Sequence, residues 1–321
     1  TDTTKTSKGQ ENFGLSIMLG IAYAANVGGL ATLIGTPPNS VFVGFMRTTY
    51  NYDVDFASWF MVGLPFSVVM LLLSFVVVVY LMYPNRLGNF SSSGNIIEKE
   101  LEKMGPVSKA EKRALAVFIT TALLWILRGP MSKLLGGMNL SDAGIAMAGA
   151  VAMFLVPADF KKGQFLLDWQ NTEKLPWGIL LLFGGGLSLA NAMQETGIVN
   201  LIGEAIAQNN TLSVWLIVAL LTAVMLFMTE LMSNLALITL MLPLVGGIAE
   251  GLNLPTMHAA VPVTIAASCA FMLPVATPPN AIVFASGHIK VSQMVRAGVL
   301  LNIASVLLLV LLANTLITWI W

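Results

Sequence analysis

One short string of residues occurs twice in this chain, and its residue types suit the binding of ions and small polar molecules. Residues 35–39 read Gly-Thr-Pro-Pro-Asn and residues 276–280 read Ala-Thr-Pro-Pro-Asn, each inside a long apolar stretch. A Pro-Pro pair removes two backbone donors and disfavours the α conformation of the preceding residue, so a helix stops and restarts there. One such string could be a simple kink in a helical bundle. Two in matched positions favour the binding site of a secondary transporter, where broken helices surround a cavity.

A second polar cluster lies at residues 229–235, which read Thr-Glu-Leu-Met-Ser-Asn-Leu between the apolar segments 212–228 and 235–249. This pattern predicts a helical hairpin with a polar tip. An Asn side chain has both a carbonyl acceptor and an NH₂ donor, so Asn234 could contact a cation and an anion together. Ser233 and Asn234 would also suit the N-terminus of the second hairpin helix. An antiparallel return in the membrane would bring this tip to the second Thr-Pro-Pro-Asn.

The positive charges of the chain are unevenly placed. There is no Lys or Arg between Lys174 and Lys290. An anion bound in this part must therefore be compensated by helix N-termini, by amide donors or by co-bound cations. Broken helices supply such termini, and they also free carbonyl oxygens that suit sodium. The distribution predicts transport of an anion coupled to a cation.

The composition predicts a multi-pass membrane protein in contact with the lipid bilayer, and we expect it in the cell (inner) membrane. Of 321 residues, 56% are hydrophobic and 10% charged, with a mean hydropathy of +0.81, whereas soluble domains have about 25% charged residues. A net charge of zero argues against a nucleic-acid partner, and a single cysteine, Cys269, excludes an intramolecular disulfide. There is room for roughly eight to ten spans or half-spans of about 20 residues. Apolar segments lie near 13–34, 59–82, 114–127, 142–157, 177–193, 212–228, 235–249, 259–286 and 297–321.

The connector 84–113 differs in kind, because Lys and Arg alternate there with Glu after a stretch rich in Ser, Gly and Asn. We expect a solvated segment that is partly an amphipathic helix. By the positive-inside rule, this connector, residues 161–162 and residues 290–296 should be cytoplasmic. No charged residue follows Arg296, so the C-terminus should face outside.

These motifs resemble the divalent anion:sodium symporter family, which includes dicarboxylate, citrate and sulfate carriers. The resemblance covers essentially the whole chain and is strongest at residues 23–39, 229–234 and 273–280. It implies an all-α polytopic membrane protein, an inverted-repeat transporter of the elevator type with re-entrant hairpins and discontinuous helices. It also implies a homodimer with a scaffold domain and a moving transport domain. The expected division is 1–58 (end of the first repeat), 59–176 (scaffold helices with the connector 84–113) and 177–321 (second repeat, with a hairpin at 212–250 and a broken helix at 256–288).

The resemblance also implies the residues of the site. One sodium would lie between the first hairpin and the break near Gly35, with Asn39, and a second between the second hairpin tip and the break at Ala276. The ligands implied for the second sodium are Thr229, Met232, Asn234 and Ala276. The residues implied for the substrate are Asn234, Ser233, Thr36, Thr277, Pro278 and Leu235.

Two departures from the family pattern affect these expectations. Bacterial members usually have Thr where this chain has Leu235, so one hydroxyl that could bond a carboxylate is missing. The effect is on the order of 0.5 to 1.5 kcal/mol, enough to shift preference among anions. The first hairpin, expected shortly before Thr1, is also missing, so the sequence looks like an N-terminally truncated piece of a longer transporter with only part of the first sodium site.

The sequence favours sodium-coupled transport of small di- or tricarboxylates such as succinate or malate, with sodium as the coupling ion. A citrate or sulfate carrier is the alternative, as is a proton-coupled anion exchanger with Glu230 or Glu195 as proton carriers. We expect Glu230 instead to cap local backbone donors or brace the hairpin. A channel ranks lower, because matched helix breaks suit alternating access. An enzyme is not expected: Ser286-Gly287-His288 is the one pairing that hints at a hydrolase, and no Gly-x-Ser-x-Gly or His-Glu-x-x-His motif is present.

Overall fold

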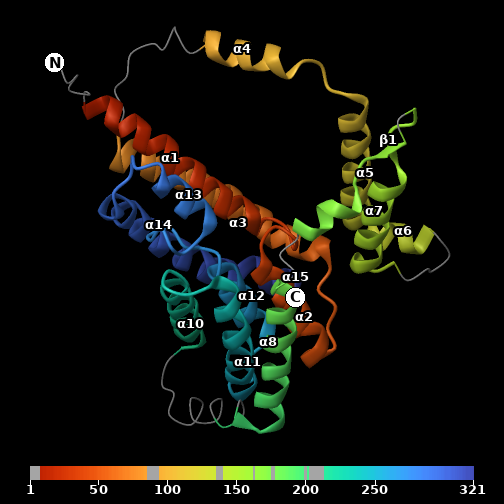
Figure 1. Ribbon diagram of the computed structural model, residues 1–321. Coiled ribbons are helices and arrows are strands. Elements are labelled where there is room, and N and C mark those ends of the chain that lie inside the picture. Colours follow the sequence, from red (N-terminus) through yellow and green to blue (C-terminus); the bar gives the residue numbers. More distant parts are fainter. Residues whose placement is uncertain are drawn as a thin grey trace. The chain divides into compact units, whose positions relative to one another are not determined.

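The computed structural model describes residues 8–84, 94–134, 140–161, 163–174, 178–198, 201 and 213–321. These residues are almost entirely helical, with one small two-stranded sheet, which confirms the all-α expectation (Figure 1). Four of the described helical stretches are long and apolar enough to cross a membrane, or five if one bent pair counts as a span. Residues 1–7, 85–93, 162, 175–177 and 212, which belong to segments discussed above, lie outside the described residues.

The chain forms two compact units. Unit 1 comprises residues 1–54, 58–87 and 179–321, and unit 2 comprises residues 55–57 and 88–178. Residues 58–87 thus belong to the same unit as both Thr-Pro-Pro-Asn strings. The division of the chain into repeats, scaffold and transport domain remains a prediction.

The first broken helix lies in unit 1 and consists of α1 (Lys8–Leu30) and α2 (Pro37–Tyr50). Pro37 and Pro38 occupy the first two helical positions of α2, where a missing N–H costs no intrahelical hydrogen bond. Thr36 is extended, with φ −148° and ψ 142°, as the following proline requires. The break therefore falls where the local sterics place it.

The helix that follows α2 in the chain fixes the end of α1 through two hydrogen bonds. It runs as α3 (Phe56–Phe75) and continues as the π-helical η1 (Val76–Met82). The Trp59 indole donates to the Leu30 carbonyl at 3.1 Å, and the Ser67 hydroxyl donates to the Val27 carbonyl at 2.9 Å. Both bonds satisfy carbonyl groups near the end of α1, which helps a helix to stop inside an apolar environment.

The second half of unit 1 contains a hairpin followed by another broken helix. The hairpin helices are α10 (Val214–Thr229) and α11 (Asn234–Gly251), and the broken helix consists of α12 (Thr256–Ala266) and α13 (Pro278–Ala285). Helix α12 is buried nearly throughout and packs against α10, α11, α14 and α2. It forms the core of this half. The remaining helices are α8 (Gly178–Glu195), α14 (Val291–Leu312), the π-helical η3 (Ala313–Ile317) and α15 (Thr318–Ile320).

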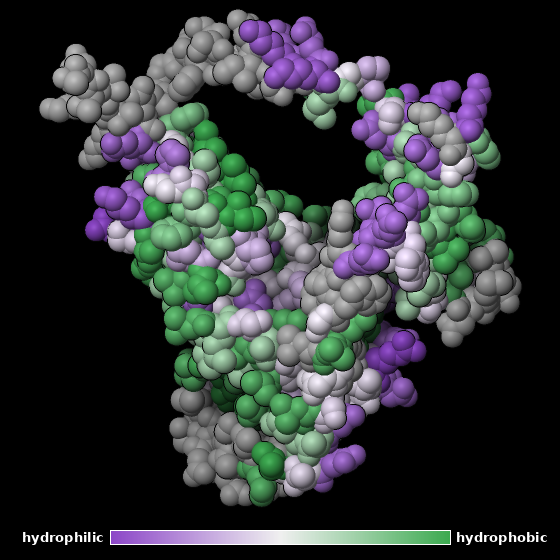
Figure 2. Space-filling model, viewed as in Figure 1, coloured by the Kyte–Doolittle hydropathy of each residue, from purple (hydrophilic) through white to green (hydrophobic). Residues whose placement is uncertain are grey.

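Unit 2 contains α4 (Gly94–Met104), α5 (Lys109–Ile126), α6 (Arg128–Leu134) and α7 (Asp142–Leu155). Strands β1 (Pro157–Asp159) and β2 (Gln164–Phe165) pair antiparallel, with Pro157 opposite Phe165, and η2 (Trp169–Lys174) follows. Figure 2 shows hydrophilic side chains gathered on α4, the described helix of the expected connector, and broad hydrophobic areas on unit 1.

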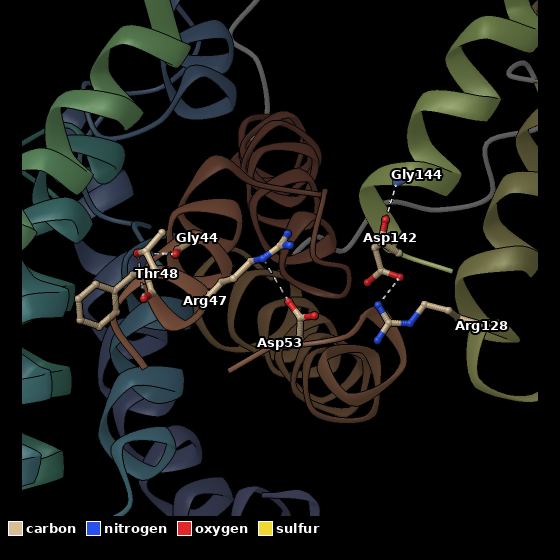
Figure 3. Close-up of polar contacts among 9 residues, drawn as sticks. Gly44, Arg47, Thr48, Asp53, Arg128, Asp142 and Gly144 are labelled. Atoms are coloured by element: carbon tan, nitrogen blue, oxygen red, sulfur yellow. Dashed lines mark hydrogen bonds and ion pairs between the residues drawn. The ribbon is translucent and has the colours of Figure 1, made fainter. Parts of the chain in front are cut away.

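A cluster of polar and aromatic side chains joins three helices of unit 2. Arg128 Nη1 lies 3.1 Å from Asp142 Oδ1, and Asp142 Oδ2 accepts from the Phe56 amide at 3.0 Å; Figure 3 shows the ion pair. The Trp125 indole donates to the Asp142 carbonyl at 3.0 Å and stacks on Phe56. The cluster joins the end of α5, the start of α6 and the start of α7, at the 82° bend between α5 and α6.

Candidate functional site

A cavity of about 610 Å³ in unit 1 is lined by both broken helices and the hairpin tip. The antiparallel return expected from the sequence therefore brings the tip and the second Thr-Pro-Pro-Asn together, and it adds the first string to the same wall. The predicted site residues that line the cavity are Gly35, Thr36, Ser233, Asn234, Leu235, Ala276, Thr277 and Pro278.

Three helices begin at this wall. Thr36, Ser233 and Thr277 are the N-cap residues of α2, α11 and α13. Each helix N-terminus carries partial positive charge, which favours a bound anion, but in α2 and α13 the first two positions are prolines and offer no N–H donor. The residues described as lining the cavity include no Lys or Arg. Helix termini, hydroxyls and amides are thus the groups that can meet an anion there.

Three predicted ligands lie off the cavity wall. Thr229 is fully buried behind the tip, and its hydroxyl lies 2.7 Å from both the Asn234 Oδ1 and the Ala267 carbonyl. Met232 is half exposed at the tip. Asn39 is fully buried, and its Oδ1 has no partner among the described residues.

The two Asn residues of the repeated string make the same local hydrogen bond. Asn39 Nδ2 donates to the Thr32 carbonyl at 2.9 Å, and Asn280 Nδ2 donates to the Leu273 carbonyl at 3.1 Å, in each case seven residues earlier. The Asn therefore gives a second hydrogen bond to a carbonyl that also accepts from the backbone amide three residues further on, Gly35 in the first break and Ala276 in the second. This shared bond gives the repeated Asn a structural role in both halves.

The two Thr residues of the string differ. The Thr277 hydroxyl accepts from the Asn280 amide at 3.4 Å and caps α13. The Thr36 hydroxyl instead lies 3.0 Å from the hydroxyl of Ser268, a residue of the second break. Both Thr36 and Ser268 line the cavity. A pair of hydroxyl groups thus joins the two halves of unit 1 at the cavity wall.

Helix α1 also makes direct hydrogen bonds to the second break. Asn26 Nδ2 lies 3.1 Å from Asn280 Oδ1 and 3.3 Å from the Ala270 carbonyl, and the Tyr23 hydroxyl donates to the Phe271 carbonyl at 2.8 Å. The predicted site residues included neither Asn26 nor Ser268, although both line the cavity. The available signal was a pair of polar residues, Tyr23 and Asn26, three apart in the part of α1 after Ser16, which is otherwise apolar.

Glu230 caps backbone donors, but these lie 41 to 43 residues away in the second break and are not the local donors expected from the sequence. Its carboxylate is 2% exposed and accepts from the amides of Phe271 at 2.8 Å, Met272 at 2.9 Å and Leu273 at 3.0 Å. Three consecutive N–H groups of the second break are therefore occupied by this side chain. Glu195, the other acidic residue considered, is exposed on α8.

Glycines allow the close approach of backbone on which the first break depends. A Cβ atom on Gly35 would lie 2.8 Å from the carbonyl carbon of Gly29 and 3.0 Å from its Cα. Real Cβ atoms do not approach backbone so closely, so residues larger than glycine would force the break apart. Gly28, one residue before Gly29, faces open space.

The donor atoms at the cavity wall indicate which kind of ion could bind there. No group of three or more His, Cys, Asp or Glu side chains that could hold a metal ion occurs among the described residues. The groups present at the cavity are hydroxyl, amide and carbonyl oxygens, the ligand type that suits a hard cation such as sodium.

Comparison with known proteins identifies relatives of the chain. Residues 2–321 match the family described as the sodium:sulfate symporter transmembrane region. The chain is 36% identical over 307 residues to a sodium-dependent dicarboxylate transporter, SdcS, of Staphylococcus saprophyticus, covering 95% of this chain and 59% of the relative. It is 35% identical over 303 residues to the SdcS of Staphylococcus aureus strain USA300, covering 94% of this chain and 58% of the relative.

The chain thus spans less than two thirds of the length of these curated relatives. The family match, in contrast, runs over nearly all of its 321 residues and includes both Thr-Pro-Pro-Asn strings and the hairpin tip. Members of this family are integral membrane transporters and not enzymes, in agreement with the apolar helices described above. The chain belongs to the sodium:sulfate symporter family, the divalent anion:sodium symporters that its motifs resemble.

Proposed function

We propose that this chain takes part in sodium-coupled transport of small di- or tricarboxylates, with four-carbon dicarboxylates such as succinate or malate as substrates. The observation that supports this most is the meeting of three helix N-termini on one cavity that lacks a Lys or Arg among its lining residues. The names of the relatives, sodium-dependent dicarboxylate transporters, agree with it.

The anion would lie against the N-termini of α2, α11 and α13. Asn234, at the start of α11, would offer its amide to one carboxylate, while Thr36 and Thr277 would face the anion from the two broken helices. Ser233 and Pro278 complete this part of the wall. Several weak donors from different helices would replace the arginine that other carboxylate sites use.

Sodium would provide the remaining positive charge. The Thr229 hydroxyl has one hydrogen but lies 2.7 Å from two acceptors, Asn234 Oδ1 and the Ala267 carbonyl. One hydrogen cannot serve both acceptors fully, and a cation among these oxygens would use their free lone pairs. We place the second sodium here, with Ala276 and the Met232 carbonyl as further ligands, and a first sodium near Gly35 and Asn39. Each charge moved across the membrane is worth about 2.3 kcal/mol per 100 mV.

Leu235 is the position that would tune the substrate. It lines the cavity, is 8% exposed and offers no hydrogen bond to a carboxylate. Citrate or sulfate remains the second candidate substrate for that reason. A homodimer with an elevator-type movement of the transport domain, as the resemblance implies, belongs to the same proposal.

Uptake of labelled succinate into proteoliposomes by the full-length transporter would test this function. We expect saturable uptake with an inward sodium gradient and none when choline replaces sodium. Asn234→Ala should abolish uptake while the protein remains folded and monodisperse. Asn314→Ala is a matched control, because Asn314 is exposed and donates to the Val310 carbonyl of its own helix. Wild-type uptake by Asn234→Ala would refute the site, and sodium-independent uptake would favour an exchanger.

A further inference from the structure

The second break is held by a buried carboxylate of the hairpin tip that the proposed transport cycle does not use. Between the end of α12 at Ala266 and the start of α13 at Pro278, the backbone leaves the helix. The amides of residues 271–273 would be orphaned there, and the Glu230 carboxylate accepts from all three. Oε1 receives two of these bonds and Oε2 the third.

A fourth donor comes from α14. Asn302 is fully buried, and its Nδ2 lies 2.8 Å from Glu230 Oε1. Its own Oδ1 has no partner among the described residues. A buried charge is stable only when strong hydrogen bonds replace its hydration, and bonds to an ionised acceptor are about twice as strong as neutral ones. The Asn302 side chain thus donates to the carboxylate, while its own carbonyl oxygen has no hydrogen-bond partner among the described residues.

Glu230 lies behind the cavity wall and not on it. The described lining residues do not include Glu230, residues 271–273 or Asn302, but they do include residues 275–279, which begin two residues after the last bonded amide. The neighbouring hairpin residue, Thr229, contacts the Ala267 carbonyl at the start of the break. Two adjacent residues of the hairpin tip therefore hold the start and the middle of one break.

We propose that Glu230 and Asn302 are positioning residues of the transport site, with Asn302 orienting the carboxylate and the carboxylate fixing residues 271–273. This inference rests on the proposed function, because its purpose is to hold Ala276 and Thr277 at the distance from Asn234 at which a cation and an anion bind. The carboxylate acts through backbone and touches neither ligand.

A proton-carrying role for Glu230 makes a different demand on the same geometry. A carrier must lose its hydrogen-bond donors and reach the cavity during the cycle. Here four N–H donors stabilise the ionised form on the side away from the cavity. The geometry favours a fixed anion that stays bound through the cycle.

Hydrogen–deuterium exchange of the full-length transporter tests the positioning role without relying on transport. In Glu230→Gln, the new NH₂ group faces backbone donors in place of one carboxylate oxygen. In Asn302→Leu, the carboxylate loses one of its four donors. We expect exchange in peptides covering residues 271–273 to rise at least tenfold in both variants. Glu195→Gln and Asn314→Leu, at exposed positions, should leave it unchanged.

Sodium-dependent uptake by the same proteins gives the second readout. We expect the half-saturating sodium concentration to rise at least fivefold in Glu230→Gln and Asn302→Leu, with a smaller change in the maximal rate. Glu230→Asp, which keeps the charge on a shorter side chain, should lie between wild type and Glu230→Gln. If Glu230→Gln or Asn302→Leu fails to fold, the sodium dependence of Glu230→Asp decides whether the positioning role holds.

The outcomes separate the two proposals. Unchanged exchange at residues 271–273 would overturn the positioning role, and so would increased exchange with unchanged sodium dependence. Absence of sodium-dependent uptake by the wild type would overturn the proposed function alone, because exchange would still show whether Glu230 and Asn302 hold the break. Uptake by the wild type that is driven by a proton gradient, and lost in Glu230→Gln, would establish the carrier role instead.

Discussion

Gly298 is the position at which the dependence of transport on the second break can be tested without altering the cavity. It lies on α14, is buried, and contacts the break directly. A Cβ atom on Gly298 would overlap the carbonyl oxygen of Phe271. It would lie 2.5 Å from the carbonyl carbon of Phe271 and 2.6 Å from the Cα atom of Met272. All three are backbone atoms in the stretch that Glu230 holds by hydrogen bonds.

Two effects of Gly298→Ala oppose each other. Alanine in place of glycine in a helix interior is worth about 1 kcal/mol of added stability. Overpacking of a filled site costs typically about 1 to 3 kcal/mol, and backbone that is fixed by hydrogen bonds cannot move aside as a flexible side chain would. We therefore expect the upper part of that range and a net loss of about 1 to 2 kcal/mol.

Thermal unfolding in detergent, with uptake measured on the same preparation, would check this magnitude. Gly28→Ala is the control, because a Cβ there meets no atom within 4 Å and should keep or raise stability. We expect a lower unfolding midpoint and reduced sodium-dependent uptake for Gly298→Ala only. If Gly298→Ala were as stable as Gly28→Ala and transported normally, the argument that the break must keep its position would be wrong.

Three further substitutions test other parts of the structure. Gly35→Ala should abolish uptake, because its Cβ would overlap Gly29 backbone in the first break; sodium-dependent uptake equal to that of wild type would contradict this. Leu235→Thr should change the ratio of half-saturating succinate to citrate by about two- to tenfold, the equivalent of one hydrogen bond, and an unchanged ratio in competition assays would exclude Leu235 from substrate selection. In unit 2, Asp142→Ala removes the partner of Arg128 and the acceptor of the Phe56 amide, at an expected cost of about 1 to 3 kcal/mol in thermal unfolding. Asp53→Ala is its control, because the pair with Arg47 is largely exposed (Figure 3) and should contribute nothing measurable; equal effects of the two substitutions would refute the comparison.

The sequence by itself determined the features that local chemistry controls. A Pro-Pro pair forbids a continuous helix whatever surrounds it, so α2 begins at Pro37 and α13 at Pro278, within the strings that predicted the breaks. The polar tip between two apolar segments likewise predicted the hairpin of α10 and α11. The membrane setting followed from composition, and the family from the spacing of these motifs.

Only the tertiary structure decided which groups meet across those breaks. Thr36 and Ser268 are 232 residues apart, and Glu230 reaches amides 41 to 43 residues away and Asn302 72 residues away. No periodicity or local propensity encodes such pairs, because they depend on how α1 packs against α13 and how the hairpin and α14 pack against α12. The same holds for the two copies of the repeated string: Thr277 caps its own helix and Thr36 bonds to Ser268, although the same Pro-Pro-Asn follows each of them. The physical reason is that a buried hydrogen-bonding group takes the partner that packing places within reach, and a repeated sequence meets different partners in two different surroundings.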